Sequence, residues 1–435
     1  MGSSEAAKPC ASECQADEAG AYSIQTSQSL PSLLESIPLI AARLGGAAQD
    51  WQVREISDGN MNLVFAATGP LGSVVVKQAL PFIRVIGASW PFPLARIRFE
   101  HEALLIHERL VSGRVPRVLH FDAARALLVM EHLDSHVVLR KGLIAGRVYT
   151  HVARHLGAFL ARSLFFTSDF FLSTPAKREM MARFDGNEVL CVTTEDVIFT
   201  SPYAEAPLNR WTSPELDATV ASIRADHELK LAATELKLLL RSSTEALLHG
   251  DLHTGSVMVS DTDTRIIDPE WARFGPMGFD VGALMGNLLL AHFSQPGHAT
   301  AGDDRRAYQE WLIATLKEIW TAFEEEMRRL AQEHDSELIP SALFSQPSMA
   351  EPLITSRLRS ILSDAIGFAG AKMIRRIIGI SHVDDFEAIK DPRTRACCEA
   401  KALALGRVMM TQRMTFGNID ALAETTRSVS AYELM

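Results

Sequence analysis

The sequence predicts an α+β protein of two lobes, a small five-stranded antiparallel sheet with one helix followed by a larger, mainly helical part. Three observations support this. Between Trp51 and Glu131 apolar residues recur mostly with a period of two, which is typical of strands. After His132 their spacing is helical almost throughout. Within that helical part, residues 248–282 concentrate acidic and histidine side chains, and there we expect the chemistry.

Length and composition are those of a globular enzyme. The 435 residues allow two or three lobes with a substantial core, and the formal net charge of −10 argues against a nucleic-acid partner. No apolar run reaches the ~18 residues that span a bilayer, and no signal-peptide pattern opens the chain, so we expect no membrane partner. The five cysteines lack paired spacing, which favours the reduced thiols of a cytoplasmic protein.

We predict four segments along the chain. Residues 1–28 are poor in large apolar residues and are expected to form a disordered leader. Residues 29–131 form the small lobe, residues 132–420 the helical lobe with the catalytic loop, and residues 421–435 a fraying tail.

The small lobe is expected to begin with a short helix over residues 30–44, interrupted at Pro38. We predict strands over residues 51–57, 62–68, 73–78, 117–121 and 127–131, and one helix over residues 95–111. The turn Asp58-Gly59-Asn60 has backbone N–H groups that can cradle phosphate oxygens. A single glycine in such a turn is also typical of an ordinary hairpin, so the turn alone does not decide its role.

Lys77 and Glu100 form a candidate ion pair. Lys77 follows three valines, and such a lysine either snorkels to solvent or pairs with a phosphate. Glu100 shares the apolar face of the predicted helix, whereas Glu102 does not. A carboxylate on the inner face needs a partner, and we expect Lys77, with Arg96 as the alternative.

Residues 130–133 connect the sheet to the helical part and read as a hinge. The backbone groups of Glu131 and Leu133 are candidates to face an adenine edge. Beyond this hinge, long helices are predicted over residues 147–167, 229–248, 306–334, 352–380 and 391–415, and another begins at residue 280.

The stretch around Asp251 has the spacing of a phosphoryl-transfer site. Strands over residues 257–259 and 265–267 predict a hairpin that brings Asp251 near Asp268 and Glu270. Three converging carboxylates repel one another unless a cation lies between them, which indicates Mg²⁺ and a phosphorylated ligand. The alternative is that these acids only cap turns.

Within this pattern each position has an expected role. Asp251 is the candidate base that accepts the proton of a substrate hydroxyl. Ser256, five positions later, sits where a metal-facing polar side chain is expected, and Asp268 is the candidate metal ligand. The carboxylate of Asp280 suits a helix N-cap or a brace on the catalytic loop.

Arg375 and Arg376 lie among apolar residues of a predicted helix. Two guanidinium groups in such a setting need acceptors. Those acceptors are substrate hydroxyls, a transferring phosphoryl group, or structural carboxylates, and spacing alone does not choose among them.

Taken together, these stretches resemble a known group of enzymes, the small-molecule kinases of protein-kinase-like fold that include aminoglycoside phosphotransferases and choline kinases. Within this group the chain is similar to the methylthioribose kinase family. The stretches that carry the resemblance are residues 58–65, 75–78, 139–144, 164–170, 249–256, 267–270, 275–280 and 374–379.

The resemblance implies a reaction and its participants. ATP would phosphorylate the anomeric hydroxyl of 5-methylthioribose to the 1-phosphate in methionine salvage, and the enzyme would be a homodimer. Asp251 would be the base, Asp268 and Glu270 would bind Mg²⁺, and Arg375 and Arg376 would contact the sugar and stabilise developing charge.

The resemblance also assigns the nucleotide contacts. Lys77, anchored by Glu100, would meet the ATP phosphates, and the turn from Asp58 through Gly59 and Asn60 to Asn62 would cover them. Two positions depart from the wider pattern: Ser256 replaces an asparagine, a stronger metal ligand, and Trp271 stands where phenylalanine is commoner.

Two other functions fit parts of the pattern. One is a kinase of the same fold that acts on an aminoglycoside, choline or another sugar, although the arginine pair favours an anionic or hydroxyl-rich acceptor. The other is a nucleotide-binding pseudokinase without catalysis, which the presence of Lys77, Asp251, Asp268 and Glu270 disfavours.

Overall fold

The computed structural model describes residues 22–56, 61–84, 87, 90–339, 343 and 347–432. The chain divides into two compact units. The first comprises the residues up to 98 together with 118–132, and the second comprises 99–117 and everything from 133 onward. Residues 99–117, predicted for the small lobe, belong to the larger unit in this division.

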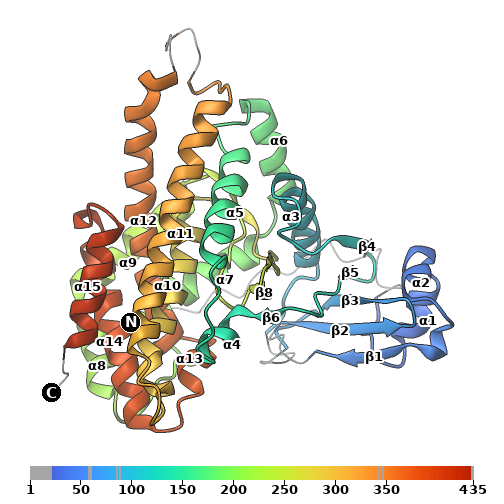
Figure 1. Ribbon diagram of the computed structural model, residues 1–435, viewed down its shortest axis with the longest axis horizontal. Coiled ribbons are helices and arrows are strands. Elements are labelled where there is room, and N and C mark those ends of the chain that lie inside the picture. Colours follow the sequence, from blue (N-terminus) through green and yellow to red (C-terminus); the bar gives the residue numbers. More distant parts are fainter. Residues whose placement is uncertain are drawn as a thin grey trace, which may run out of the picture. The chain divides into compact units, whose positions relative to one another are not determined.

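The first unit is built on a five-stranded antiparallel sheet (Figure 1) in the order β1-β2-β3-β5-β4. Its strands are β1 (Gln52–Glu55), β2 (Asn62–Gly69), β3 (Gly72–Ala79), β4 (Val118–Asp122) and β5 (Leu127–Glu131). All five predicted strands are confirmed, with ends that shift by one or two residues. Lys77 on β3 lies between Val64 on β2 and Leu128 on β5, in the middle of the sheet.

Two short helices, α1 (Leu30–Glu35) and α2 (Pro38–Leu44), complete the core of this unit. Pro38 occupies the first position of α2, where its missing N–H costs no hydrogen bond. The predicted interruption at Pro38 is therefore confirmed. The two helices and the sheet share one apolar core, formed by Leu30, Leu34, Ile40, Leu44, Trp51, Phe65, Val74, Val76, Leu127 and Val129.

The chain is already structured ahead of these helices. The Tyr22 hydroxyl donates to the carbonyl of Ala79 at 2.9 Å, and the Gln25 amide donates to the Gln78 side chain at 2.8 Å. The predicted leader extended to residue 28, but its last residues are ordered by hydrogen bonds to β3. The reason is that Gln78, fully buried, needs these hydrogen-bond partners. Residues 1–21 lie outside the described residues.

Arg96 anchors the irregular segment between β3 and helix α3 (Arg96–Leu110). Its guanidinium is fully buried and donates to the carbonyls of Leu80 and Pro93, each at 2.8 Å, and to Asn62 Oδ1 at 2.7 Å. Charge-assisted bonds of this kind stabilise a segment without regular structure.

The second unit is mainly helical (Figure 1). Its helices are α4 (Leu139–Ile144), α5 (Val152–Phe166), α6 (Thr174–Phe184), α7 (Glu188–Phe199), α8 (Asp217–Ala225), α9 (His227–Ser242), α10 (Gly278–Ser294), α11 (Arg306–Glu333), α12 (Glu351–Ile378), α13 (Asp384–Glu387), α14 (Pro392–Thr411) and α15 (Ile419–Ala431). Its short strands are β6 (Val137–Val138), β7 (Ala246–Leu248), β8 (Val257–Val259), β9 (Thr264–Ile266) and β10 (Arg273–Gly275).

Helix α15 occupies the segment that was predicted to fray. Ile419, Leu422, Ala423 and Thr426 are buried. They recur at helical spacing, so the segment buries one apolar face against its neighbours and remains folded. The prediction of a fraying tail from residue 421 is therefore wrong as far as residue 431.

The close crossing of α10 and α12 organises this unit. Gly278, Gly282 and Gly286 lie on one face of α10, four residues apart, and meet the backbone of α12. A Cβ atom at Gly278 would lie 2.8 Å from the Ala365 amide nitrogen, and one at Gly286 would lie 2.8 Å from the Ala369 carbonyl oxygen. Only glycine permits so close a backbone approach.

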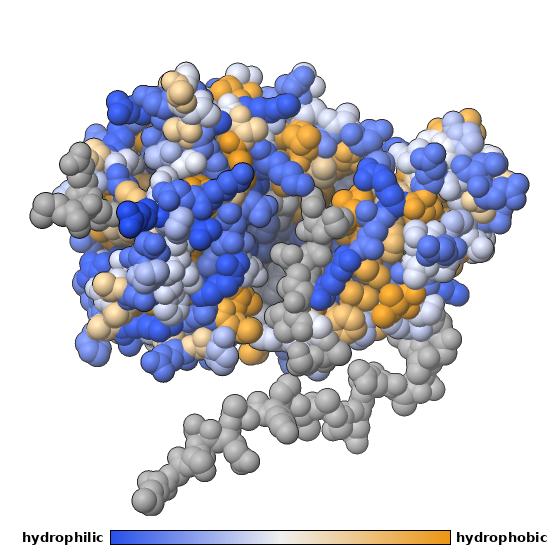
Figure 2. All heavy atoms as spheres, turned by 90° about the horizontal axis from the view of Figure 1, so that it is seen from below, coloured by the Kyte–Doolittle hydropathy of each residue, from blue (hydrophilic) through white to orange (hydrophobic). Residues whose placement is uncertain are grey.

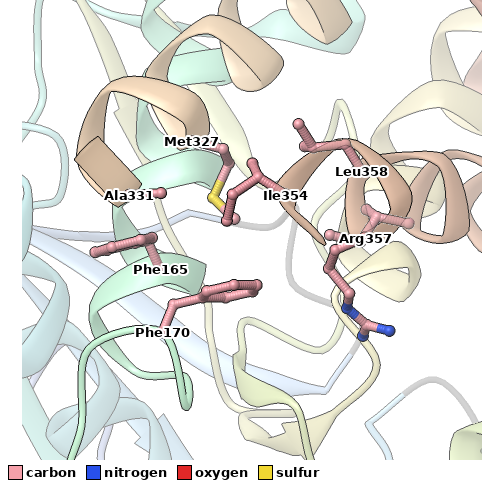
Figure 3. A pocket seen from close by; sticks show the side chains of 8 residues that line it. Phe165, Phe170, Met327, Ala331, Ile354, Arg357 and Leu358 are labelled. Carbon is pink, nitrogen blue, oxygen red and sulfur yellow. The ribbon is translucent and has the colours of Figure 1, made fainter. Parts of the chain in front are cut away.

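A small cavity lies between α5, α11 and α12 (Figure 3). Its volume is only about 10 Å³. Its lining is apolar except for Arg357, whose guanidinium points away from the cavity and pairs with Glu245. An apolar void of this size is too small for a ligand, so it indicates imperfect packing.

The surface seen in Figure 2 is mostly hydrophilic, with apolar side chains in small groups. Among the described residues, no helix combines the length and apolarity needed to cross a bilayer.

Replacing Gly282 by alanine tests the helix crossing. The added methyl group meets the Ala365 carbonyl, so we expect Gly282→Ala to lower the free energy of unfolding by about 1–3 kcal/mol. Urea denaturation measures the change. Gly302→Ala is the matched control, since a Cβ at Gly302 meets nothing within 4 Å. Equal stabilities for the two variants would contradict a tight crossing.

Glu399 on α14 gives stability a pH dependence. The side chain is 1% exposed, and burial raises the pKa of its carboxyl from 4.5 to about 7. Between these values the folded state binds a proton that the unfolded state has lost, so stability falls as pH rises from 5 to 8, by up to about 3 kcal/mol. Glu399→Gln should remove this component, so that it is more stable than the wild type at pH 8 and similar at pH 5. Thermal unfolding at both pH values measures it, with the exposed Glu424→Gln as control.

Candidate active site

The predicted catalytic loop leaves β7 at Leu248 and is held by the brace predicted at Asp280. The His249 amide donates to Asp280 Oδ2 at 2.6 Å, and the Gly250 amide donates to Oδ1 at 3.0 Å. Gly250 has a φ of 87°, and a Cβ there would collide with the Trp271 carbonyl. A glycine and a buried carboxylate on α10 together set the direction in which the loop leaves the strand.

The predicted hairpin after the loop is confirmed. Strands β8 and β9 pair antiparallel, with Val257 opposite Ile266. His249 Nε2 lies 2.9 Å from the Ile267 carbonyl, which joins the start of the catalytic loop to the residue before Asp268. Asp268 itself has a φ of 71°, a strained conformation for a residue with a side chain.

Asp251 lies among cationic side chains of α12. Its Oδ1 is 3.2 Å from Lys372 Nζ, and its Oδ2 is 3.7 Å from Arg376 Nη2 and 3.3 Å from His253 Nε2. Burial opposes ionisation, but His253, Lys372 and Arg376 outweigh it and hold the pKa of Asp251 well below its ordinary value. The carboxylate is 26% exposed, so an acceptor hydroxyl can reach it.

His253 acts as a neutral hydrogen-bond donor. Burial lowers the pKa of its imidazole to about 4. The Gly255 amide donates to Nδ1 at 2.9 Å, so the proton resides on Nε2 and points to Asp251 Oδ2. The positive charge beside Asp251 therefore comes from α12 rather than from the histidine.

Three carboxylates form a second cluster. Single oxygens of Glu100, Asp268 and Glu270 lie within 4.8 Å of one another, and Glu100 and Glu270 are 1% and 2% exposed. Hard oxygen donors at this spacing fit Mg²⁺, and buried like charges this close favour a cation between them. Asp268 and Glu270 were predicted as metal ligands, whereas Glu100 was predicted to pair with Lys77.

The pairing of Lys77 stays a prediction, because Lys77 and Glu100 belong to different units. Whether Glu100 or Glu102 pairs with it also stays open. Glu102 forms an ion pair with Arg183 at 3.0 Å, as expected for a carboxylate away from the apolar face.

Ser256 is held inside the catalytic loop. It is 3% exposed, and its hydroxyl donates to the Asp251 carbonyl at 3.1 Å. This bond closes the loop on itself. A role for Ser256 as a metal ligand stays a prediction.

The adjacent arginines differ in their surroundings. Arg376 is 6% exposed and donates to the Ser381 carbonyl at 2.9 Å, while Arg375 is half-buried. The Nε atoms of both are buried without a hydrogen-bond partner among the described residues. The carboxylates of Asp251 and Asp385 both act on the Arg376 guanidinium, so the choice among the three acceptors stays open.

The predicted nucleotide contacts of the first unit are only partly described. Asp58, Gly59 and Asn60 lie outside the described residues. Asn62 is 3% exposed and bonded to Arg96, and Lys77 is 6% exposed. Glu131 ends β5 and the 8%-exposed Leu133 follows it, so their part in nucleotide binding stays a prediction.

Sequence analysis missed three residues at this site, namely Lys372, His253 and Arg140. Lys372 stands one helical turn before Arg376, and that spacing is a signal of a shared face. Arg140, at the start of α4, joins several elements. Its amide donates to the Thr254 carbonyl and its guanidinium to Asn287 on α10, both at 3.0 Å, and it also lies 3.0 Å from Asp385 on α13.

Known proteins resemble this chain over most of its length. Residues 52–333 match the phosphotransferase enzyme family (APH). The chain is 43% identical over 395 residues to methylthioribose kinase 1 of Oryza sativa subsp. japonica, which covers 90% of this chain and 92% of that protein. It is 40% identical over 411 residues to the methylthioribose kinase of Escherichia coli O45:K1 (strain S88 / ExPEC), covering 93% and 98%.

Replacing Asp280 by asparagine tests the brace on the loop. One of its two acceptor oxygens becomes an amide that faces a backbone N–H, so we expect a loss of about 1–3 kcal/mol in the free energy of unfolding. Catalytic turnover should fall as well, because the loop that carries Asp251 shifts. Urea denaturation and steady-state kinetics measure the two effects.

Asp391→Asn is the control for this variant. Asp391 caps α14 at an exposed position, and asparagine caps helices equally well. If Asp280→Asn matched this control in both stability and turnover, Asp280 would not be holding the catalytic loop.

Proposed function

Because this chain belongs to the methylthioribose kinase family among the phosphotransferase enzymes, we propose that it transfers the γ-phosphoryl group of ATP to the anomeric hydroxyl of S-methyl-5-thioribose. The products are the 1-phosphate and ADP. The observation that carries this proposal is the partly exposed, ionised carboxylate of Asp251 held among the cations of α12.

In this reaction Asp251 accepts the hydroxyl proton. As the sugar oxygen bonds to the γ-phosphorus, the bond from that phosphorus to the β–γ bridging oxygen breaks and ADP leaves. A carboxylate of depressed pKa is a weak base, so its main task is to orient the hydroxyl and to take the proton late. A loose transition state, in which the nucleophile bonds weakly, tolerates this.

Arg375 and Arg376 are proposed to face the sugar and the transferring phosphoryl group. Arg376 Nη2 lies 3.7 Å from Asp251 Oδ2, and Arg375, its neighbour on α12, also feels the charge of Asp251, so both lie beside the candidate base. Arginines that neutralise the equatorial oxygens of the phosphoryl group contribute about 10³–10⁵ to rate in related chemistry.

Asp268 and Glu270 are proposed to hold Mg²⁺, with Glu100 beside them and Ser256 as a further candidate ligand. When bound, the ion neutralises charge on the ATP phosphates. Lys77 and the turn from Asp58 to Asn62 are proposed to contact those phosphates, and the backbone of Glu131 and Leu133 the adenine edge.

An ADP-release assay with Mg·ATP tests the proposal. Methylthioribose, ribose, choline and kanamycin are compared as acceptors, and we expect turnover with methylthioribose above all others. Asp251→Ala should lower kcat by about 10²–10⁴-fold, because the proton acceptor is gone. Asp304→Ala, at an exposed position, is the control.

Each other outcome has a distinct meaning. Turnover of a different acceptor would replace the substrate and retain the mechanism. ATP binding without turnover of any acceptor would favour a nucleotide-binding pseudokinase.

A further inference from the structure

Lys372 is buried at the active site without a role in the reaction described so far. It is 2% exposed and lies on α12, three residues beyond Ala369, where the close crossing with α10 ends. Its Nζ lies 3.2 Å from Asp251 Oδ1 and 4.4 Å from the centroid of the Phe279 ring. A desolvated ammonium is costly, so these two neighbours must compensate it.

The position of this ammonium is set by rigid surroundings. Phe279 is fully buried on α10, and its ring packs edge-on against Phe368 of α12, with centroids 5.2 Å apart. The tight glycine crossing holds the two helices at that distance. Lys372 therefore presents its charge to Asp251 from a fixed direction.

The two oxygens of Asp251 have different partners. Lys372 bonds Oδ1, while His253 and Arg376 approach Oδ2. Contacts on both oxygens fix the rotation of the carboxylate plane. Arg375 and Arg376, by contrast, retain buried Nε donors without partners among the described residues. Lys372 and Arg376 thus contact different oxygens of Asp251, and only Lys372 reaches Oδ1 among the printed contacts of the described residues.

We propose that Lys372 is a positioning residue that acts through Asp251. It orients the carboxylate toward the acceptor hydroxyl and offsets its charge, so that the negative γ-phosphoryl group can approach an ionised base. This inference rests on the proposed function. Burial and the adjacent arginines lower the pKa of Lys372 while Asp251 raises it, which agrees with a charge that depends on this partner.

A double-mutant cycle on kcat tests the proposal. The variants are Lys372→Met, Asp251→Asn and both together, measured in the steady state with Mg·ATP and methylthioribose. We expect Lys372→Met to lower kcat about 100-fold, the size of effect seen when a reacting group is misplaced by about 1 Å. Because Lys372 acts through Asp251, the double variant should be no slower than Asp251→Asn alone.

Two further readouts separate positioning from support of the fold. The KM for ATP should stay within about twofold, since Lys372 contacts the acceptor side. Lys372→Arg, which restores a positive charge, should recover at least about tenfold of the lost kcat. Lys372→Gln replaces the methionine variant if that one does not fold. Lys401→Met on α14, whose Nζ donates to the Ser430 carbonyl, is the control and should match the wild type.

The outcomes distinguish this inference from the proposed function. Multiplicative losses in the double variant, or a wild-type kcat in Lys372→Met, would overturn the role of Lys372. Absence of wild-type turnover with methylthioribose would instead overturn the proposed substrate, and the cycle would then be run with whichever acceptor the wild type uses.

Discussion

The close crossing of α10 and α12 is the constraint on which the active site depends. The glycines of α10 allow the backbone of α12 to approach it directly, and a methyl group at any of them would meet backbone or Cβ atoms. Helix α10 also carries Asp280, which binds the catalytic loop, and α12 carries Lys372 and Arg376, which bind Asp251. The distance between the candidate base and the cations beside it therefore depends on this one pair of helices.

Two buried carboxylates near the loop have opposite tasks. Asp280 is 2% exposed, and both of its carboxylate oxygens accept hydrogen bonds from backbone amides of the loop. Its task is therefore to hold the catalytic loop in place. Asp251 keeps part of its surface exposed and is surrounded by side chains. Burial raises the pKa of Asp280, whereas the cations of α12 hold the pKa of Asp251 low. Burial and partners rather than residue type thus set the direction in which the pKa of each acid shifts.

Charge is concentrated where a phosphoryl group would be transferred. On one side Glu100, Asp268 and Glu270 form an acidic cluster suited to a divalent cation. Around Asp251 positive charge predominates. The cationic groups of Lys372, Arg375 and Arg376 outnumber the carboxylates beside them. Catalysis of phosphoryl transfer is largely the placement of such charges, and a rigid helical frame keeps them from relaxing toward one another.

Much of this organisation was determined by the sequence alone. Period-two segments predicted all five strands of the sheet, and the spacing after Asp251 predicted the hairpin, because strand pairing and turns are local. The inward face of Glu100 followed from helical periodicity. Only the tertiary structure decided which residue each inward side chain meets. Lys372 reaches Asp251 across 121 positions, and Glu100 joins Asp268 and Glu270, because periodicity specifies the face of a helix but not the element packed against it.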